Sequence, residues 1–359
     1  EKNGISMLNK PFAVGFRIEH LREDIDNILK QDINWDKLRK SNVLITGAGG
    51  MLGSYMMKTL IVLNEEKSFD MNIYVLVRGE NRIPPKFRKK VNIIVQSVIQ
   101  PVDCDVPFDF VIHTASPASP KIMKDDPVGT VAANAIGTYY TLEAAKRGSG
   151  KGYLFISSRE IYGQPYENQK IFTEETYGFV DPLDARSCYP EGKKVAETMC
   201  ACYRAQYGID AKIARLAHTF GPGMSLDDGR VQADFLRNLV NDEDIVLKSD
   251  GSAIRTYTYV GDAVAALFYI LLNGTETVYN ISSEADTVSI KGLAEAMVKA
   301  YPEKNLQLKF EIPKSKSNNG SAPFTLGVLN SDKLKKLGWK PKYSLIEGIR
   351  RTVEFLREQ

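Results

Sequence analysis

The chain has 359 residues, enough for one and a half to two domains, and its 43% hydrophobic and 25% charged residues are typical of a soluble globular protein. A formal net charge of +3 is too small to indicate binding to nucleic acid or to a membrane surface. The four cysteines show no CxxC pair and are too sparse for a disulfide framework, so we expect reduced thiols and no metal centre.

The first predicted element is an amphipathic helix within an N-terminal extension that covers residues 1–40. An apolar stripe interrupts the charged residues 18–30, with Ile18, Leu21, Ile25, Ile28 and Leu29 at helical spacing. The pattern leaves open whether this helix packs on the main fold or on a partner. The sequence "EKNGISMLNK" at the start has no apolar run of the signal-peptide kind, and a cytoplasmic protein is expected.

From residue 41 onward, short β-branched runs alternate with longer helical segments. A helix is predicted over Pro127–Arg147, with Asp126 as its N-cap and proline in its first turn. Continuous apolar strands that alternate with helices predict an α/β fold with a Rossmann-type, doubly wound parallel sheet over residues 41–217. Residues 218–359 have a looser rhythm and predict a smaller, irregular C-terminal lobe, with some segments that return to the sheet. The apolar run 263–272 is too short to span a bilayer and predicts a buried helix.

A glycine-rich stretch, "TGAGGMLGS", follows the first strand. Gly47, Gly50 and Gly53 are spaced GxxGxxG, and Met51 and Leu52 begin the next helix. Glycines at these positions allow a tight turn, close approach of a pyrophosphate and close packing of helix on strand. Because the motif lies between a strand and a helix, it predicts a dinucleotide site.

The second strand ends at "YVLVRGENR", where a fold that binds NAD usually carries an acid for the ribose hydroxyls. Arg78 stands there instead, and a guanidinium can pair with the 2′-phosphate of NADP. These residues therefore do not decide between NAD and NADP.

Tyr189 and Lys193 are four residues apart in "SCYPEGKKVAE" and share one face of a predicted helix. A nearby ammonium lowers the pKa of a phenol, which makes it a proton acceptor near neutral pH. With Ser158 at the end of an upstream strand and a dinucleotide loop, this set predicts a hydride-transfer enzyme.

These motifs resemble the extended short-chain dehydrogenase/reductases that modify nucleotide sugars, and most of all the UDP-glucuronate decarboxylases. Related 4-epimerases and 4,6-dehydratases belong to the same group. The resemblance runs from about residue 41 to residue 262, through the glycine loop and the stretches "HTASPASP", "NAIGT", "SSREIYG", "ARSCYPEGKKVAETMC", "HTFGP" and "DDGRVQADF".

The resemblance implies a role for each matching residue. Tyr189 would take the proton of the sugar 4-hydroxyl, Lys193 would bind the nicotinamide ribose, and Ser158 would hydrogen-bond the same oxygen. Arg230 and Arg255 would hold the nucleotide diphosphate in the C-terminal lobe. The resemblance also implies a bound NAD that is recycled within each turnover, contacted by Thr114 as well as by the glycine loop, and a homodimer formed through the helix 189–207.

The chain departs from the decarboxylase pattern at four positions. Arg78 replaces the ribose-binding acid, and Ser97 stands where an aspartate near the adenine is usual. His218 replaces an asparagine, and could be either a substrate donor or a buried structural histidine. Arg159 replaces a small hydroxyl residue.

Arg159 and Glu160 favour different reactions. If the chain stays extended, Ser158 and Glu160 point one way and Arg159 the other, where it could pair with an acid elsewhere. If Arg159 enters the pocket, it could bind a sugar carboxylate. A clamp on a carboxylate stabilises the ground state of a decarboxylation, so it favours a 4-epimerase. Glu160 is retained by decarboxylases and is the base of 4,6-dehydratases, but arginine is a poor general acid, which disfavours dehydration. A non-catalytic dinucleotide-binding protein is the alternative of a different class.

Overall fold

The centre of the molecule is a seven-stranded parallel sheet in the order β10-β6-β5-β4-β1-β2-β3. The computed structural model describes residues 19–312 and 326–358. The strands of this sheet are β1 (Asn42–Thr46), β2 (Asn72–Val77), β3 (Asn92–Val95), β4 (Phe110–His113), β5 (Gly152–Ser158), β6 (Ala211–Leu216) and β10 (Val278–Ile281). The predicted α/β, doubly wound fold class is confirmed.

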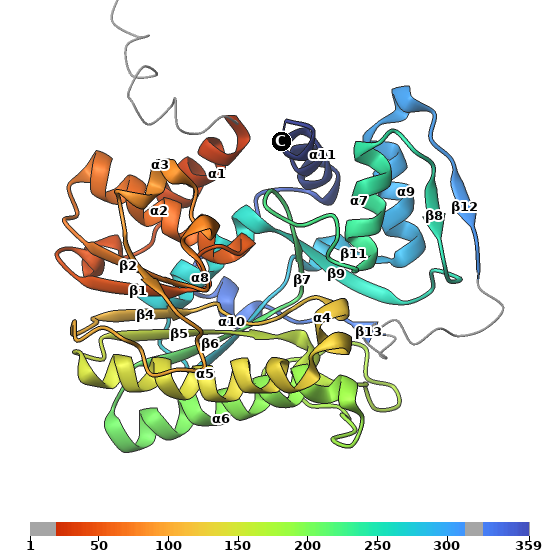
Figure 1. Cartoon of the computed structure of the whole chain (residues 1–359). Coiled ribbons are helices and arrows are strands. Elements are labelled where there is room, and N and C mark those ends of the chain that lie inside the picture. Colours follow the sequence, from red (N-terminus) through yellow and green to blue (C-terminus); the bar gives the residue numbers. More distant parts are fainter. Residues whose placement is uncertain (1–18, 313–325, 359) are drawn as a thin grey trace, which may run out of the picture.

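Helices cover both faces of this sheet (Figure 1). On one face lie α2 (Met51–Lys67) and α8 (Val260–Asn273), and on the other α5 (Pro127–Arg147) and α6 (Cys188–Tyr207). Successive residues of β1 alternate between these layers: Val43 packs with the α2 side and Leu44 with the α5 side. Burial on both faces explains why the strands are continuously apolar.

The sequence anticipated two of these helices closely. α5 begins at Pro127, and the Asp126 carboxylate accepts a hydrogen bond of 2.9 Å from the Gly129 amide, as expected of an N-cap. α8 is buried along almost its whole length. Among the described residues, no helix combines the length and apolar character that crossing a bilayer requires.

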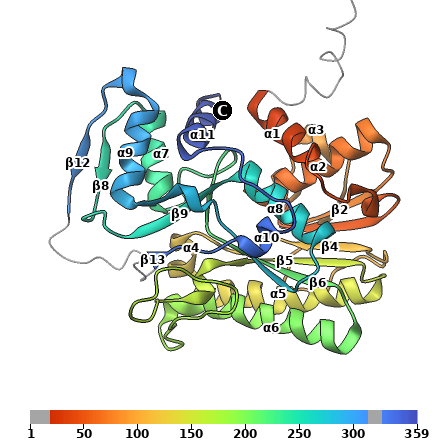
Figure 2. The ribbon, with the colours of Figure 1, turned by 180° about the vertical axis from the view of Figure 1, so that it is seen from behind.

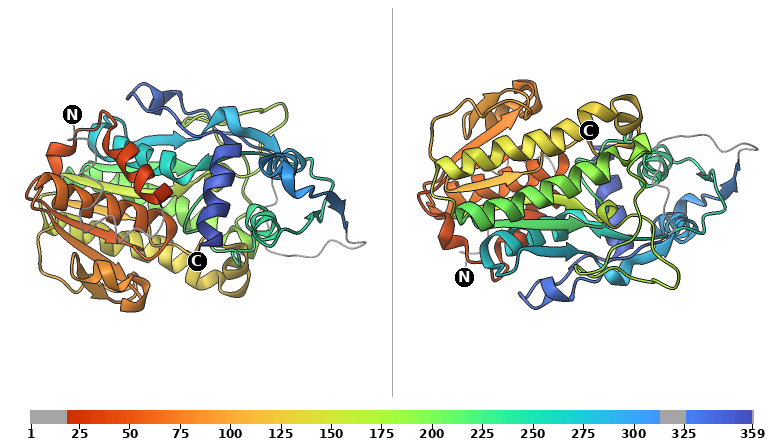
Figure 3. Two further views of the ribbon diagram at one scale, coloured as in Figure 1. Left: turned by 90° about the horizontal axis from the view of Figure 1, so that it is seen from above. Right: turned by 90° about the horizontal axis from the view of Figure 1, so that it is seen from below.

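A second lobe lies beyond one end of the strands, as the views from behind and from above show (Figures 2 and 3). The chain reaches it after β6, yet α8 and β10 return to the main sheet. The lobe and its connections contain β7 (His218–Phe220), α7 (Val231–Val240), β8 (Ile245–Leu247), β9 (Ile254–Tyr259), β11 (Thr287–Ser289), α9 (Ile290–Ala300), β12 (Leu308–Phe310), β13 (Leu326–Gly327) and α11 (Leu345–Arg357). Short helices elsewhere are η2 (Trp35–Leu38), η3 (Glu80–Arg82), α3 (Pro85–Arg88), α4 (Pro120–Asp125), η4 (Arg159–Tyr162), η5 (Ala185–Ser187), η6 (Glu284–Asp286), η7 (Pro302–Lys304) and α10 (Asp332–Lys335).

The N-terminal helix α1 (Glu19–Leu29) packs on α2 and α8, so the chain uses its apolar stripe within its own fold. Ile25 and Ile28 are buried in the core shared with α8. Ile18, the first residue of the predicted stripe, lies outside the described residues. Of the two arrangements that the sequence left open, the structure shows α1 packed on the main fold.

A buried carboxylate attaches α1 to three other elements. Asp24 is fully buried and accepts hydrogen bonds from the Tyr55 hydroxyl (3.1 Å), the Tyr259 hydroxyl (2.7 Å) and the Arg351 guanidinium (2.6 Å). These partners come from α2, β9 and α11. Asp24 therefore joins the N-terminal extension to the main sheet domain and to the lobe.

We expect Asp24→Ala to lower the free energy of unfolding by about 3–5 kcal/mol, because it removes the buried carboxylate of Arg351 and leaves this guanidinium with only the half-exposed Glu23 as its ion-pair partner. Asp26→Ala, on the same helix, removes a part-exposed ion pair with Arg22 and should cost less than about 1 kcal/mol. Urea unfolding of the two variants measures the difference. Equal losses would show that the Asp24 cluster does not hold α1 in place.

Candidate functional site

The loop between β1 and α2 leaves no space for a side chain at Gly47 or Gly53. Gly47 has φ of +71°, and a Cβ there would lie 2.8 Å from the Ala115 amide nitrogen. A Cβ on Gly53 would lie 2.4 Å from the Gly47 carbonyl oxygen. α2 begins directly after Gly50, with Met51 and Leu52 half-buried in its first turn. Backbone amides at a helix N-terminus in such a bare loop fit the pyrophosphate of a dinucleotide.

Side chains at the end of β4 contact Thr46, the last residue of β1 before this loop. The Thr114 hydroxyl donates to the Thr46 carbonyl oxygen at 2.7 Å, and the His113 Nδ1 lies 2.8 Å from the Thr46 hydroxyl. Burial, together with the charge of Lys193, lowers the pKa of His113 to about 3, so this histidine is neutral. Thr114 is among the predicted cofactor-binding residues, whereas His113 is not.

The residues predicted for the adenosine end lie at the same edge of the sheet. Arg78 follows β2 and is exposed, and Ser97 follows β3 and is half-buried. It is Arg82, in η3, that abuts the glycine loop: a Cβ on Gly49 would lie 2.8 Å from the Arg82 Cβ.

Ser158, Tyr189 and Lys193 come together where α6 packs on β5. Tyr189 is 8% exposed and Lys193 3% exposed. The Lys193 Nζ donates to the Ile156 carbonyl oxygen at 2.6 Å and lies 5.5 Å from the centre of the Tyr189 ring. The predicted proton-handling residues thus share one buried position at the carboxyl end of β5.

The protonation of this group differs from the expectation that Lys193 lowers the pKa of Tyr189. Burial, together with the charge of Glu160, raises the pKa of Tyr189 to about 12, although hydrogen bonding with Ser158 acts to lower it. Burial also lowers the pKa of Lys193 to about 7. Desolvation of Tyr189 outweighs the charges of Arg230 and Arg186, which act to lower its pKa.

Glu160 forms an ion pair that the sequence analysis missed. Its two carboxylate oxygens each lie 3.0 Å from a nitrogen of the Arg186 guanidinium, and both side chains are mostly buried. Arg186 stands three residues before Tyr189, inside the quoted stretch "ARSCYPEGKKVAETMC", so its proximity to the site was available from the sequence. The extended geometry considered for 158–160 is wrong, because β5 ends at Ser158 and η4 begins at Arg159.

Arg159 is buried on the side of η4 that faces the second lobe. Its guanidinium donates to the Gly163 carbonyl oxygen at 3.2 Å and lies 5.7 Å from the Phe172 ring centre. Burial, opposed by the charge of Glu160 and assisted by that of Arg255, lowers the pKa of Arg159 to about 9.

His218 lies among three guanidinium groups. Burial and the charges of Arg255, Arg159 and Arg230 lower its pKa well below the usual value, so it is neutral. Its Nδ1 is buried and has no hydrogen-bond partner among the described residues. Arg230, directly before α7, pairs with Asp228. The structure thus gathers all four predicted substrate-binding residues around one cationic region between sheet and lobe.

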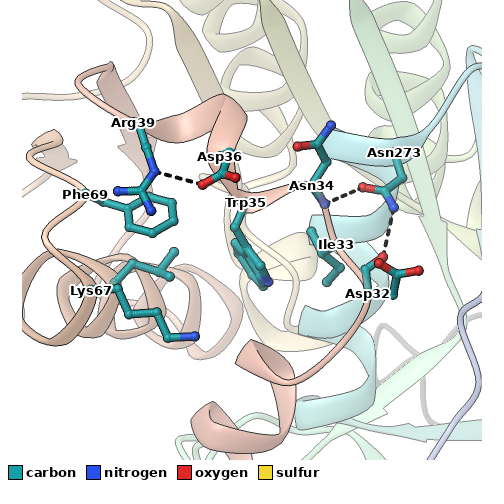
Figure 4. Close-up of a pocket in the computed structure, with 10 residues that line it drawn as sticks. Asp32, Ile33, Asn34, Trp35, Asp36, Arg39, Lys67, Phe69 and Asn273 are labelled. Carbon is teal, nitrogen blue, oxygen red and sulfur yellow. Dashed lines mark hydrogen bonds and ion pairs between the residues drawn. The ribbon is translucent and has the colours of Figure 1, made fainter.

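A separate pocket of about 540 Å³ lies at the N-terminal segment (Figure 4). Arg39 stacks on the Phe69 ring at 4.1 Å and pairs with Asp36 at its rim. The residues that line this pocket are Asp32, Ile33, Asn34, Trp35, Asp36, Arg39, Leu63, Lys67, Phe69 and Asn273. None of the predicted catalytic or binding residues is among them, so this pocket is distinct from the candidate active site.

Comparison with known proteins agrees with this geometry. The family model described as "NAD dependent epimerase/dehydratase family" matches residues 43–282. UDP-glucuronic acid decarboxylase 1 of Arabidopsis thaliana is 33% identical over 322 residues, which cover 89% of this chain and 71% of that protein.

Solved structures show the same fold. UDP-glucose 4-epimerase of Thermotoga maritima, solved with UDP-glucose, superposes with a TM-score of 0.74 at 22% identity, over 88% of this chain and 99% of that one. UDP-glucuronic acid 4-epimerase of Bacillus cereus, solved with UDP-glucuronic acid and NAD, gives a TM-score of 0.71 at 19% identity, with the same coverage of both chains. The glycine loop, the serine, tyrosine and lysine at β5 and α6, and the match over two thirds of the sequence agree: the chain belongs to the NAD-dependent epimerase/dehydratase family, whose cofactor is NAD.

Proposed function

We propose that this enzyme decarboxylates UDP-glucuronate through a 4-keto sugar. The observation that carries the proposal is the two-point ion pair between Glu160 and Arg186, set beside Tyr189. Because both oxygens of Glu160 are bound to a guanidinium, this carboxylate is poorly placed to remove a proton from C5. Loss of a C6 carboxylate from a 4-keto sugar needs no such base. The identity to UDP-glucuronic acid decarboxylase 1 supports the same reaction.

In the first step Tyr189 accepts the proton of the 4-hydroxyl, and Ser158 hydrogen-bonds the same oxygen. NAD, when bound, would supply the hydride acceptor for C4 and a positive charge that lowers the pKa of the Tyr189 phenol, so that the phenolate can accept this proton. The C5–C6 bond of the resulting β-keto acid then breaks, its electron pair moves into the C4 ketone as an enolate, and CO2 leaves. C5 takes a proton from water, Tyr189 gives its proton back to the 4-oxygen, and the bound cofactor would give back the hydride that it took from C4.

The basic residues at the second lobe suit the rest of the substrate. Arg230 and Arg255 carry the positive charge that a nucleotide diphosphate requires, and a guanidinium can grip phosphate oxygens at two points. We assign them to the diphosphate, and Arg159 and His218 to the sugar end.

A 4-epimerase that acts on the same uronate is the second candidate, and Arg159 is the observation that favours it. A guanidinium bound to the C6 carboxylate stabilises the group that decarboxylation must lose. A 4,6-dehydratase fits less well, because Arg159 is a poor general acid and Glu160 is held by Arg186.

Incubation with UDP-glucuronate and mass analysis of the products test the proposal. Loss of CO2 supports decarboxylation. An isobaric product with inverted C4 supports the epimerase and overturns the decarboxylase, and loss of water overturns both. UDP-glucose, which lacks the carboxylate, serves as the control substrate and should give no CO2.

We also propose a homodimer, formed through the outer faces of α5 and α6, which run side by side across the sheet (Figure 3). These faces expose Val128 (78%), Tyr139 (44%) and Val195 (45%). Sedimentation should give twice the 40.1 kDa chain mass, and Val195→Glu should give monomers, because it places a charge in an apolar interface. Val95→Glu, on the edge strand β3, is the matched control and should leave the mass unchanged. A wild-type monomer at micromolar concentration would contradict the dimer.

A cytoplasmic location is part of the proposal and is supported by the four free cysteines.

A further inference from the structure

One face of α6 contacts three consecutive residues at the end of β5. Tyr189, Lys193 and Glu197 follow one another at four-residue intervals, so they lie in one row on the helix. Tyr189 interacts with Ser158, Lys193 donates to the Ile156 carbonyl oxygen, and Glu197 accepts from the Ser157 hydroxyl at 2.6 Å. Three contacts therefore set the position of α6 along β5, and two of them involve the predicted catalytic residues Tyr189 and Lys193.

The third contact is anchored more firmly than the other two. The Glu197 carboxylate also accepts from the Nε (3.0 Å) and Nη2 (2.6 Å) of Arg215, which lies on β6, the strand next to β5. The Nη1 of Arg215 donates to the Tyr162 hydroxyl at 2.9 Å and to the Glu174 carbonyl oxygen at 3.0 Å. Arg215 is 4% exposed and Ser157 3% exposed.

This network has no place in the proposed chemistry, because none of its side chains is among the predicted catalytic or binding residues. A buried ion pair is weak evidence for stability, since apolar residues of similar volume often serve as well. Its best-attested use is to define one arrangement of packed elements over others. The charge of Glu197 also acts to raise the pKa of buried Lys193, which favours the ammonium form.

We propose that Ser157, Glu197 and Arg215 act as positioning residues that fix the register of α6 against β5 and so place Tyr189 beside Ser158. The proposal rests on the proposed function for the roles of Tyr189 and Ser158. Catalysis is sensitive to such placement, because a displacement of about 1 Å costs on the order of 100-fold in rate.

The test compares variants that remove the network without leaving a buried charge alone. Glu197→Gln with Arg215→Gln removes both charges and keeps a polar amide at each position, and Ser157→Ala removes only the hydroxyl. Glu191→Gln is the matched control, because Glu191 lies on the same helix and pairs with Lys194 at the surface. Ser157→Thr restores the hydroxyl and serves as the rescue variant.

We expect the double variant to lower kcat by about 10- to 100-fold while KM and the affinity for NAD, measured by calorimetry, stay unchanged. Ser157→Ala should lower kcat less, Ser157→Thr should regain it, and Glu191→Gln should match the wild type. A folded double variant with wild-type kcat, or one whose loss lies in KM alone, overturns the proposal. The kinetics use whichever nucleotide sugar the wild type converts, so a failure of the UDP-glucuronate assignment does not affect this outcome.

A second measurement does not depend on activity. Crystal structures of the wild type and the double variant are compared. In the double variant α6 should be displaced along β5, with a longer distance between the Tyr189 and Ser158 hydroxyl oxygens than in the wild type. An unchanged separation overturns the positioning role, whatever the substrate proves to be.

Discussion

Tyr189→Phe is expected to reduce turnover by at least about 100-fold and by up to about 10,000-fold, because it removes the proton acceptor for the sugar 4-hydroxyl. The phenyl ring keeps nearly all of the volume of this buried side chain, so the fold should be retained. The glycine loop is untouched, and NAD should still bind. Rates with the converted nucleotide sugar, together with calorimetric titration of NAD, measure the two expectations separately.

Tyr203→Phe is the matched control for this variant. Tyr203 lies on the same helix and also gives its hydroxyl to a hydrogen bond, but its partner is Glu143 on α5, away from the site. It should keep wild-type turnover. If Tyr189→Phe lost only a few-fold in rate, the hydroxyl would not be the proton acceptor, and the proposed mechanism would fail at its first step.

Arg159→Ser is expected to raise the KM for UDP-glucuronate by at least about tenfold while kcat stays the same or rises. A guanidinium that binds the C6 carboxylate stabilises the bound substrate, and this stabilisation is lost as CO2 forms. Removal of the side chain thus weakens binding without slowing the chemical step. Steady-state kinetics with UDP-glucuronate separate the two constants.

The affinity for UDP-glucose is the internal control for Arg159→Ser, since that sugar lacks the carboxylate and should bind both forms equally. Weaker binding of both nucleotides would mean that Arg159 holds the diphosphate or the fold. If kcat and KM for UDP-glucuronate did not change, the role of Arg159 would be structural only, through its contacts with Gly163 and Phe172. If the wild type inverts C4, gain of CO2 release in Arg159→Ser would support a clamp that retains the carboxylate.

Patterns of short range led to the correct fold class and to the glycine loop. The apolar strands, the helix that begins at Pro127 and the bare turn at Gly47 are each dictated by local sequence, through propensity, capping and steric space. The pairing of Tyr189 with Lys193 needed only the helical period. Such features depend on neighbours within a few residues, and the sequence contains them in full.

The partners of Glu160 and Arg159 could not be read in this way. Whether the chain stays extended after Ser158 depends on η4, and the position of η4 depends on packing against α6. The same holds for the pKa of Tyr189, because burial is a property of the whole fold and here raises this pKa to about 12.

By itself, then, the sequence determined the parallel sheet and the glycine loop, and it predicted which residues handle the proton, since these follow from periodicity and from the shape of single residues. Only the tertiary structure decided that α1 packs on its own chain, that Arg186 holds Glu160, and that Glu197 and Arg215 join α6 to the sheet. The physical reason is that ion pairs and desolvation act between side chains brought together from distant parts of the chain, and their energies depend on distances that no local pattern contains.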